Sequence, residues 1–82
     1  MPDTFYMGTI ALVAFNFAPP GWALCDGQVL PIAPNAALFT LLGTTYGGNG
    51  QTTFALPNIK ASSLQEGLNY MIAVQGIYPS RG

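Results

Sequence analysis

Only a few side chains in this sequence are of a type that could carry out catalysis. The chain holds one cysteine, Cys25, and no histidine. A cysteine nucleophile needs a nearby base such as histidine, and zinc sites need several cysteine or histidine ligands. The serines, Ser62, Ser63 and Ser80, lack a histidine partner and the G-x-S-x-G turn of hydrolases. We therefore predict that Cys25 is a small, buried, apolar side chain.

The three carboxylates are equally poor candidates for a reactive site. General acid–base catalysis needs two titratable groups held close together, and a calcium loop needs several acidic oxygens close in sequence. Asp3 lies near the start of the chain, Asp26 belongs to a turn signal, and Glu66 lies in a polar stretch. We therefore predict that the protein is not an enzyme and holds no metal or cofactor.

A glycine-rich stretch at residues 43–53 (GTTYGGNGQTT) invites comparison with phosphate-binding loops. A P-loop has the pattern G-x-x-x-x-G-K-[ST] between a strand and a helix, and its lysine contacts the phosphates. Residues 43–53 contain no lysine, follow the expected helix, and do not match G-x-G-x-x-G. We interpret them as a turn-rich loop in which the glycines adopt positive φ.

The composition points to assembly. Charged residues make up 6% of the chain, against about 25% in an average soluble domain. A chain of 82 residues is only marginally stable as a monomer, and neither a disulfide nor a zinc site is available to support it. We expect part of the surface to face other subunits. Nucleic-acid binding is excluded because two basic residues cannot form a phosphate-binding surface.

Neither a secretory signal nor a membrane span is evident. The chain opens with Met-Pro-Asp and has no basic segment before its first apolar run. That run, residues 5–18, is shorter than the roughly 20 residues needed to cross a bilayer. We expect an extracellular protein or a component of a virion or tail-like particle, released by lysis or by a dedicated machine.

The two ends of the chain each predict a strand. Residues 9–17 and 68–78 are rich in β-forming residues and apolar on both faces, which indicates strands covered on both sides. We predict that they pair with each other. In so thin a domain, one of the covers is expected to come from a neighbouring chain.

Shorter elements fill the middle of the chain. Residues 22–25 and 28–30 are expected to form a hairpin around Asp26-Gly27, and residues 54–56 a returning strand. Residues 34–42 predict a helix with Pro34 in its first turn, Ala33 as a weak N-cap and Gly43 just past its end. Trp22 is expected to cover the core edge, with its indole N–H on a carbonyl. The fold class is α+β: a small, mostly-β domain of short strands packed on one helix, with the N- and C-terminal strands paired.

The residues GTIALVAFNFAPPGWALCDGQVLPI and NAALFTLLGTTYGGNGQTTFALPNI closely resemble the phage tail collar domain of tail fibres and the microcystin-dependent-protein group. The resemblance covers residues 7–60, and LNYMIAVQGIYPSR at residues 68–81 resembles the family's closing segment. Longer relatives carry an additional region between these blocks, which contributes to receptor binding and sometimes holds a metal. Here residues 61–67 join the blocks directly. The resemblance implies one domain, residues 1–82, with a collar core (7–60), a connector (61–67) and a closing strand (68–82).

These observations predict a non-enzymatic structural subunit that assembles with copies of itself, and with other tail proteins, in a phage tail or fibre. A closed ring, a trimer and an open filament are all compatible with them. A strand from a neighbour's terminus would be a natural joint, and deleting the first eight residues would then abolish polymer. The alternative is a receptor- or glycan-binding module that uses Trp22, Tyr46 and Tyr78. Arg81 is a candidate for setting the register of assembly. The predicted assembly residues are Phe5, Tyr6, Ile10, Leu12, Tyr70, Ile72, Val74, Tyr78 and Arg81.

Overall fold

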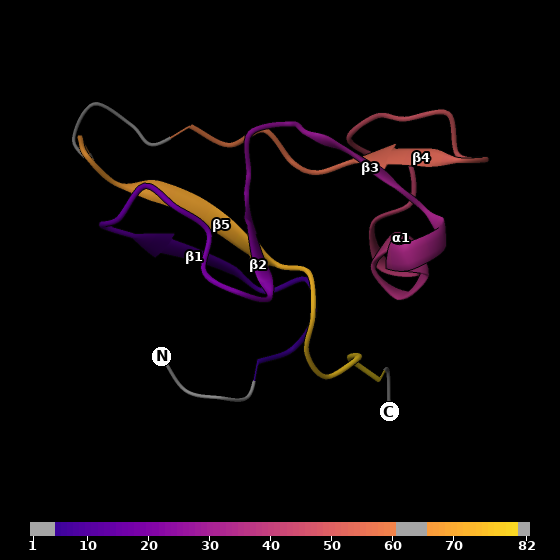
Figure 1. The fold of residues 1–82 in the computed structure, drawn as a ribbon, viewed down its shortest axis with the longest axis horizontal. Coiled ribbons are helices and arrows are strands. Elements are labelled where there is room, and N and C mark those ends of the chain that lie inside the picture. Colours follow the sequence, from indigo (N-terminus) through magenta and orange to yellow (C-terminus); the bar gives the residue numbers. More distant parts are fainter. Residues whose placement is uncertain (1–4, 61–65, 81–82) are drawn as a thin grey trace.

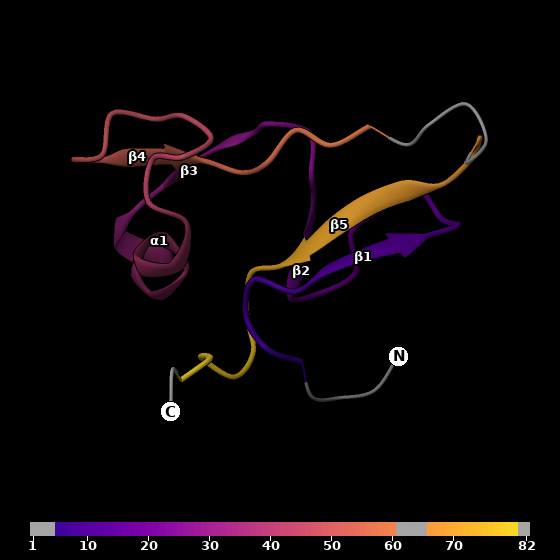
Figure 2. The ribbon, with the colours of Figure 1, turned by 180° about the vertical axis from the view of Figure 1, so that it is seen from behind.

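The computed structural model describes residues 5–60 and 66–80. In these residues five strands form two antiparallel sheets, one of order β1-β5-β2 and one of β3 and β4. The three-stranded sheet makes one end of the molecule, and the two-stranded sheet and α1 make the other (Figures 1 and 2). The elements are β1 (Ile10–Val13), β2 (Trp22–Leu24), β3 (Val29–Pro31), the 3₁₀ turn η1 (Ala33–Asn35), α1 (Ala36–Leu42), β4 (Thr53–Ala55) and β5 (Asn69–Ala73).

The predicted pairing of the N- and C-terminal strands is confirmed. β1 runs antiparallel to β5, with Ile10 opposite Ile72 and Leu12 opposite Tyr70. Both strands are rich in apolar residues that suit a pleated surface. The predicted α+β fold, mostly β with one short helix, is confirmed as well.

Both terminal strands are shorter than predicted. β1 ends at Val13 rather than at residue 17, and β5 ends at Ala73 rather than at residue 78. The ladder ends because Val74 and Gln75 both donate their N–H to the carbonyl of Gly21. Beyond that point residues 5–8 and 75–78 run side by side (Figure 1), joined by an isolated bridge between Tyr6 and Ile77.

The predicted hairpin at Asp26-Gly27 is wrong. β2 pairs with β5, whereas β3 pairs with β4 in the other sheet. The Asp26 carboxylate accepts the N–H of Gln28 at 3.1 Å, so a turn is present. The Gly27 N–H, however, donates to Pro57 (3.2 Å), a residue that lies far ahead in the sequence. The chain therefore crosses from one sheet to the other at this turn.

The predicted helix is present, but its first turn differs. η1 (Ala33–Asn35), which contains Pro34, precedes the α-helical residues 36–42, and no side chain caps either segment. The prediction of Ala33 as N-cap is therefore wrong. The predicted end is confirmed, since the Gly43 N–H donates to Phe39 at 2.7 Å with φ of 59° at Gly43. Packing holds the helix, because Leu38 is only 1% exposed.

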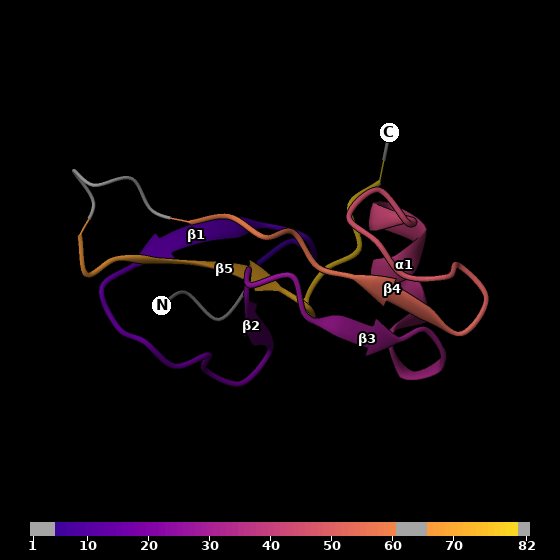
Figure 3. The ribbon, with the colours of Figure 1, turned by 90° about the horizontal axis from the view of Figure 1, so that it is seen from above.

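The core joins both sheets to the helix. Its buried members come from β4, β5, α1 and the segments after β2 and β4, and the ring of Phe39 packs 5.5 Å from that of Phe54. Figure 3 shows α1 close to β4 at one end of the molecule. The buried cluster consists of Cys25, Leu38, Phe54, Leu56 and Ile72.

Candidate assembly surface

In the part of the chain that the structure describes, the residues that could do chemistry do not gather into a metal site. Within residues 5–60 and 66–80, no group of three histidine, cysteine, aspartate or glutamate side chains could hold a metal ion. Cys25 is 4% exposed, and this burial, followed by the nearby charge of Asp26, raises the pKa of its thiol. At neutral pH Cys25 is therefore a protonated, buried side chain, as predicted.

Side-chain hydrogen bonds within the glycine-rich stretch hold it in its observed conformation. The Asn49 side-chain oxygen accepts the backbone N–H groups of Gln51, Thr52 and Thr53 at 2.8–3.1 Å. Gly48 has φ of 90°, and a Cβ there would collide with the backbone of Phe54. These contacts make residues 43–53 a compact turn, in agreement with the predicted turn-rich loop.

β1 carries an exposed apolar face. Ile10 is 41% exposed and Leu12 is 37% exposed, although both share a face of the sheet with buried Ile72. The single chain leaves this face of β1 open, so the cover that was expected from a neighbouring chain stays a prediction. Ile10 and Leu12 are available to a neighbour.

The predicted assembly residues of the closing strand face the chain's own core. Tyr70 and Val74 are half-buried and pack against the core cluster. Ile72 is 0% exposed, so it is part of the core and leaves no surface for another subunit. Since Met71 and Ala73 are buried on the opposite face, β5 is covered on both sides, as predicted.

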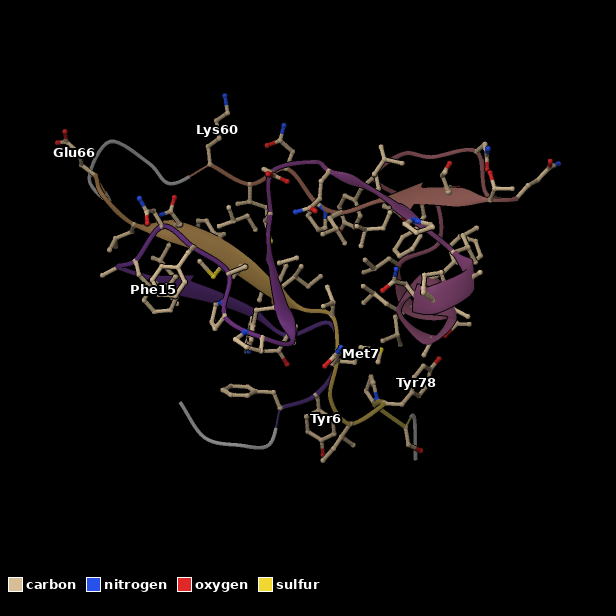
Figure 4. The ribbon with its side chains drawn as sticks, in the orientation of Figure 1. Tyr6, Met7, Phe15, Lys60, Glu66 and Tyr78 are labelled. Atoms are coloured by element: carbon tan, nitrogen blue, oxygen red, sulfur yellow. The ribbon has the colours of Figure 1, made fainter. Side chains whose placement is uncertain are left out.

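A second group of predicted residues lies where residues 5–8 run beside residues 75–78. The Phe5 ring packs edge-on against Trp22, with centroids 5.0 Å apart. Tyr6 is 59% exposed, and it lies with Tyr78 on the same side of the molecule (Figure 4). The Tyr78 hydroxyl forms a 2.7 Å hydrogen bond with the Thr40 hydroxyl of α1. Arg81, the remaining predicted residue, lies outside the described residues.

Comparison with known protein families identifies the type of domain to which these surfaces belong. The model of the phage tail collar domain matches residues 8–64 of the 82-residue chain. The chain belongs to the phage tail collar domain family. The family has a structural role in phage tail fibres and is not known as an enzymatic one. No curated protein and no solved structure matches the chain significantly.

Three exposed apolar residues of this collar domain were missed in the sequence. Phe17 is 62% exposed and contacts only the ring of Phe15, at 5.1 Å, among described aromatic rings. Val29 is 59% exposed on β3, and Ile77 is 49% exposed beside Tyr6. The double proline at Pro19-Pro20 signalled a chain reversal, but the early end of β1, which leaves Phe17 outside the sheet, has no local signal.

The aromatic residues of the glycan alternative have separate intramolecular roles in this collar domain. Trp22 is half-buried against Phe5, and its indole N–H makes no hydrogen bond to a described residue, contrary to prediction. Tyr46 is 50% exposed in the glycine-rich loop, whereas Tyr78 is joined to Thr40.

Charge is sparse on the surface of the collar domain. The charged side chains in the described residues are Asp26, Lys60 and Glu66, and all three are exposed. Lys60 and Glu66 point outward at the end of the molecule that holds β1 and β5 (Figure 4). No helix among the described residues is long and apolar enough to cross a membrane.

Proposed function

We propose that this collar domain is a self-assembling, non-enzymatic subunit of a phage tail, tail-like particle or filament, in which copies of the chain contact one another through apolar surface. The observation that carries the proposal is the combination of exposed apolar side chains with a nearly uncharged surface. Ile10, Leu12 and Tyr6 are between 37% and 59% exposed, while the whole chain has five charged residues. Ile10 and Leu12 lie on the same face of β1, and exposed apolar residues that lie together on a surface mark interaction sites.

The family supports a place in the virion or in a tail-like particle, next to other tail proteins. We propose that the whole of residues 1–82 forms one domain in that assembly. The assembly surface includes Phe5, Tyr6 and Tyr78 at the junction of the chain ends, and Ile10 and Leu12 at the edge of β1. Tyr70 and Val74 support these surfaces from within, and Arg81 remains the candidate for register.

The first test is the assembly state of the purified chain at neutral pH and moderate salt. Light scattering after size exclusion gives the mass of particles in solution, and negative-stain electron microscopy distinguishes closed rings from filaments. Oligomers or filaments would support the proposal. Monomers up to high concentration would overturn it and favour the receptor-binding alternative, in which exposed Tyr46 and Tyr78 would contact a glycan.

Deletion of the first eight residues is a poor test of a strand exchanged between copies. Residues 5–8 bond to the chain's own C-terminal segment: Met7 donates to Ile77 at 2.8 Å, and Gly8 donates to Ala73 at 2.8 Å. Their removal would therefore damage the fold as well as any contact between copies. Tests of assembly have to change side chains that the single chain does not use.

A further inference from the structure

The hydrogen-bond pattern of β5 shows which way its neighbours face. In an antiparallel sheet, successive residues of a central strand bond alternately to the two flanking strands. The carbonyl of Tyr70 accepts the N–H of Cys25 at 3.0 Å, so the even-numbered residues of β5 bond toward β2. Ala73 exchanges hydrogen bonds with Gly8 and Thr9, at 2.8 and 2.9 Å, so the odd-numbered residues bond toward β1.

The same alternation leaves Ile10 and Leu12 with their backbone groups pointing outward. Ala11 lies opposite the odd-numbered Met71 and bonds to it, whereas Ile10 and Leu12 lie opposite even-numbered residues that bond to β2. No described residue donates to or accepts from the backbone of Ile10 or Leu12 on the open side. β1 therefore presents two N–H and two C=O groups to its surroundings.

The edge of β2 on the other side of this sheet is occupied by the chain itself. The N–H of Trp22 donates to Pro19 at 3.0 Å. The carbonyl of Leu24 accepts the side-chain amide of Gln28 at 3.1 Å. β2 therefore has little left with which to pair another strand.

The edges of the two-stranded sheet are largely occupied, and on β3 only the single residue Val29 has outward backbone groups without a described partner. On β3, Pro31 has no N–H, and its carbonyl accepts the side-chain amide of Asn35 at 3.0 Å. On β4, the N–H of Ala55 donates to Gly47 of the glycine-rich loop at 3.1 Å. Among the described strands, β1 alone keeps a run of unused outward groups with exposed apolar side chains.

We infer that the open edge of β1 pairs with the same edge of a second copy of this chain, antiparallel and about a two-fold axis at Ala11. This inference deepens the proposed self-assembly and rests on it. In that register Ile10 lies opposite Leu12 of the second copy, and each such pair exchanges two N–H···O=C bonds. Two pairs use all the outward groups of both copies. The two three-stranded sheets then continue as one sheet.

The side chains and charges of the edge fit a second copy as partner. Ile10 and Leu12 lie on one face of β1, so each would meet the other's apolar side chain across the axis, where cross-strand pairs stabilise sheets. No charged residue occurs from Phe5 to Cys25. Natural edge strands avoid such pairing with lysines, prolines or very short strands. β1 is short, with four residues, but it has neither lysine nor proline and is long enough for the two Ile10–Leu12 pairs. An uncharged edge suits the equally uncharged edge of a second copy.

Disulfide trapping tests the register directly. Residues opposite each other in a pair without mutual hydrogen bonds have Cα atoms about 4.5 Å apart, within the span of a disulfide. Ala11→Cys places one thiol at the axis in each copy. The control is Val29→Cys, a 59% exposed site on another strand, which is more accessible than the half-buried Ala11. Buried Cys25 stays in both variants because its thiol is shielded.

We expect Ala11→Cys to form a disulfide-linked dimer under mild oxidation at least about tenfold faster than Val29→Cys at equal protein concentration. Independently, Leu12→Lys places a charge at the edge, and we expect about tenfold weaker dimerisation than for Val29→Lys, which adds the same charge elsewhere. Circular dichroism of both lysine variants checks that they fold.

The results separate this inference from the proposed function. If the unmodified chain assembles while Ala11→Cys cross-links no faster than Val29→Cys, the edge pairing is overturned and self-assembly stands. Unchanged assembly of folded Leu12→Lys would overturn the pairing in the same way. If the unmodified chain stays monomeric, the proposed function itself fails.

Discussion

Gly76 lies directly against the backbone of Phe5, so closely that a Cβ at residue 76 would collide with the Phe5 carbonyl oxygen. That oxygen accepts the N–H of Ile77 at 2.8 Å, and the Met7 N–H donates to the Ile77 carbonyl at 2.8 Å. Gly76 has φ of 134°, a conformation open to glycine and rarely to other residues. The junction between the two ends of the chain therefore depends on this glycine.

Gly76→Ala is expected to weaken the contact between residues 5–8 and residues 75–78. The substitution adds backbone strain, about 1 to 3 kcal/mol, and overpacking against Phe5, about 1 to 3 kcal/mol. We expect a loss of roughly 2 to 6 kcal/mol in the free energy of unfolding, measured by urea denaturation. Gly67→Ala is the control, since Gly67 has φ of 84° but no atom of the described residues within 4 Å of its Cβ position, and it should lose the strain contribution alone. Equal losses in the two variants would show that the contact with Phe5 is unimportant.

The terminal strand pairing and the position of the helix were predictable because their signals are local. Pro34 and Gly43 mark the two ends of the helical region by their backbone chemistry, and Leu38 supplies its buried side chain. The two ends of the chain are apolar on both faces, which only a strand with covered faces requires. Covered faces do not tell which strands flank β5, so its central position came from the structure.

The path through Asp26-Gly27 was not predictable from its neighbours in sequence. The dipeptide favours a two-residue hairpin, but Gly27 bonds to Pro57 and the carbonyl of Cys25 accepts from Ile59 at 2.9 Å. Partners thirty or more residues ahead outweigh the local turn preference. The open edge of β1 was hidden for the same reason, since it depends on which strands flank β5.

The predicted assembly residues fall into two groups, exposed and buried, because the sequence does not show which strands lie at the edge of the sheet. Ile10 and Leu12 were chosen as apolar strand residues, and so was Ile72. All three share one face of the sheet, yet Ile72 is in the centre and 0% exposed, whereas the other two lie at the edge. Periodicity identifies the face of a strand but not its place within the sheet.

Asn49 is expected to hold the glycine-rich loop in its observed conformation. Asn49→Ala removes three bonds from backbone N–H groups to one oxygen, and we expect it to lower the free energy of unfolding by about 1 to 3 kcal/mol. Asn49→Asp keeps the accepting oxygen and loses only the amide bond to the Thr52 hydroxyl, which measures 3.0 Å. Its loss should be about 1 kcal/mol or less. Denaturation of the two variants side by side is the measurement. If Asn49→Asp loses as much stability as Asn49→Ala, the amide group of Asn49, rather than its oxygen, stabilises the loop.

The bond between Tyr78 and Thr40 is expected to tether the C-terminal segment to α1. Tyr78→Phe removes this exposed hydrogen bond and keeps the ring, so we expect less than about 1 kcal/mol of lost global stability. Local opening should increase, because a segment held by few contacts opens below the global free energy of unfolding. Hydrogen exchange at the amide of Ile77, which donates to Phe5, should quicken severalfold. Tyr46→Phe, in the glycine-rich loop, should leave this exchange rate unchanged. Unaltered exchange in Tyr78→Phe would show that the Tyr78 hydroxyl does not hold the segment.

Cys25 is expected to make the stability of the fold decline in alkaline solution. Burial, with a smaller contribution from Asp26, raises the pKa of the folded thiol above the pKa that it has in the unfolded chain. Between the unfolded pKa, about 8.5, and the higher folded pKa, the native state binds more protons than the unfolded state. The free energy of unfolding therefore falls as pH rises through this range, by at most about 1.4 kcal/mol per pH unit.

Cys25→Ala isolates this effect, since it removes the thiol and leaves every other side chain in place. Urea denaturation from pH 7 to pH 10 should give a steeper decline for the cysteine-containing chain, with the difference beginning near the ordinary cysteine pKa of about 8.5. Parallel curves would mean that the thiol ionises as readily in the folded chain as in the unfolded one. In that case water reaches Cys25, and the core cluster that joins the two sheets is more open than the 4% exposure of Cys25 indicates.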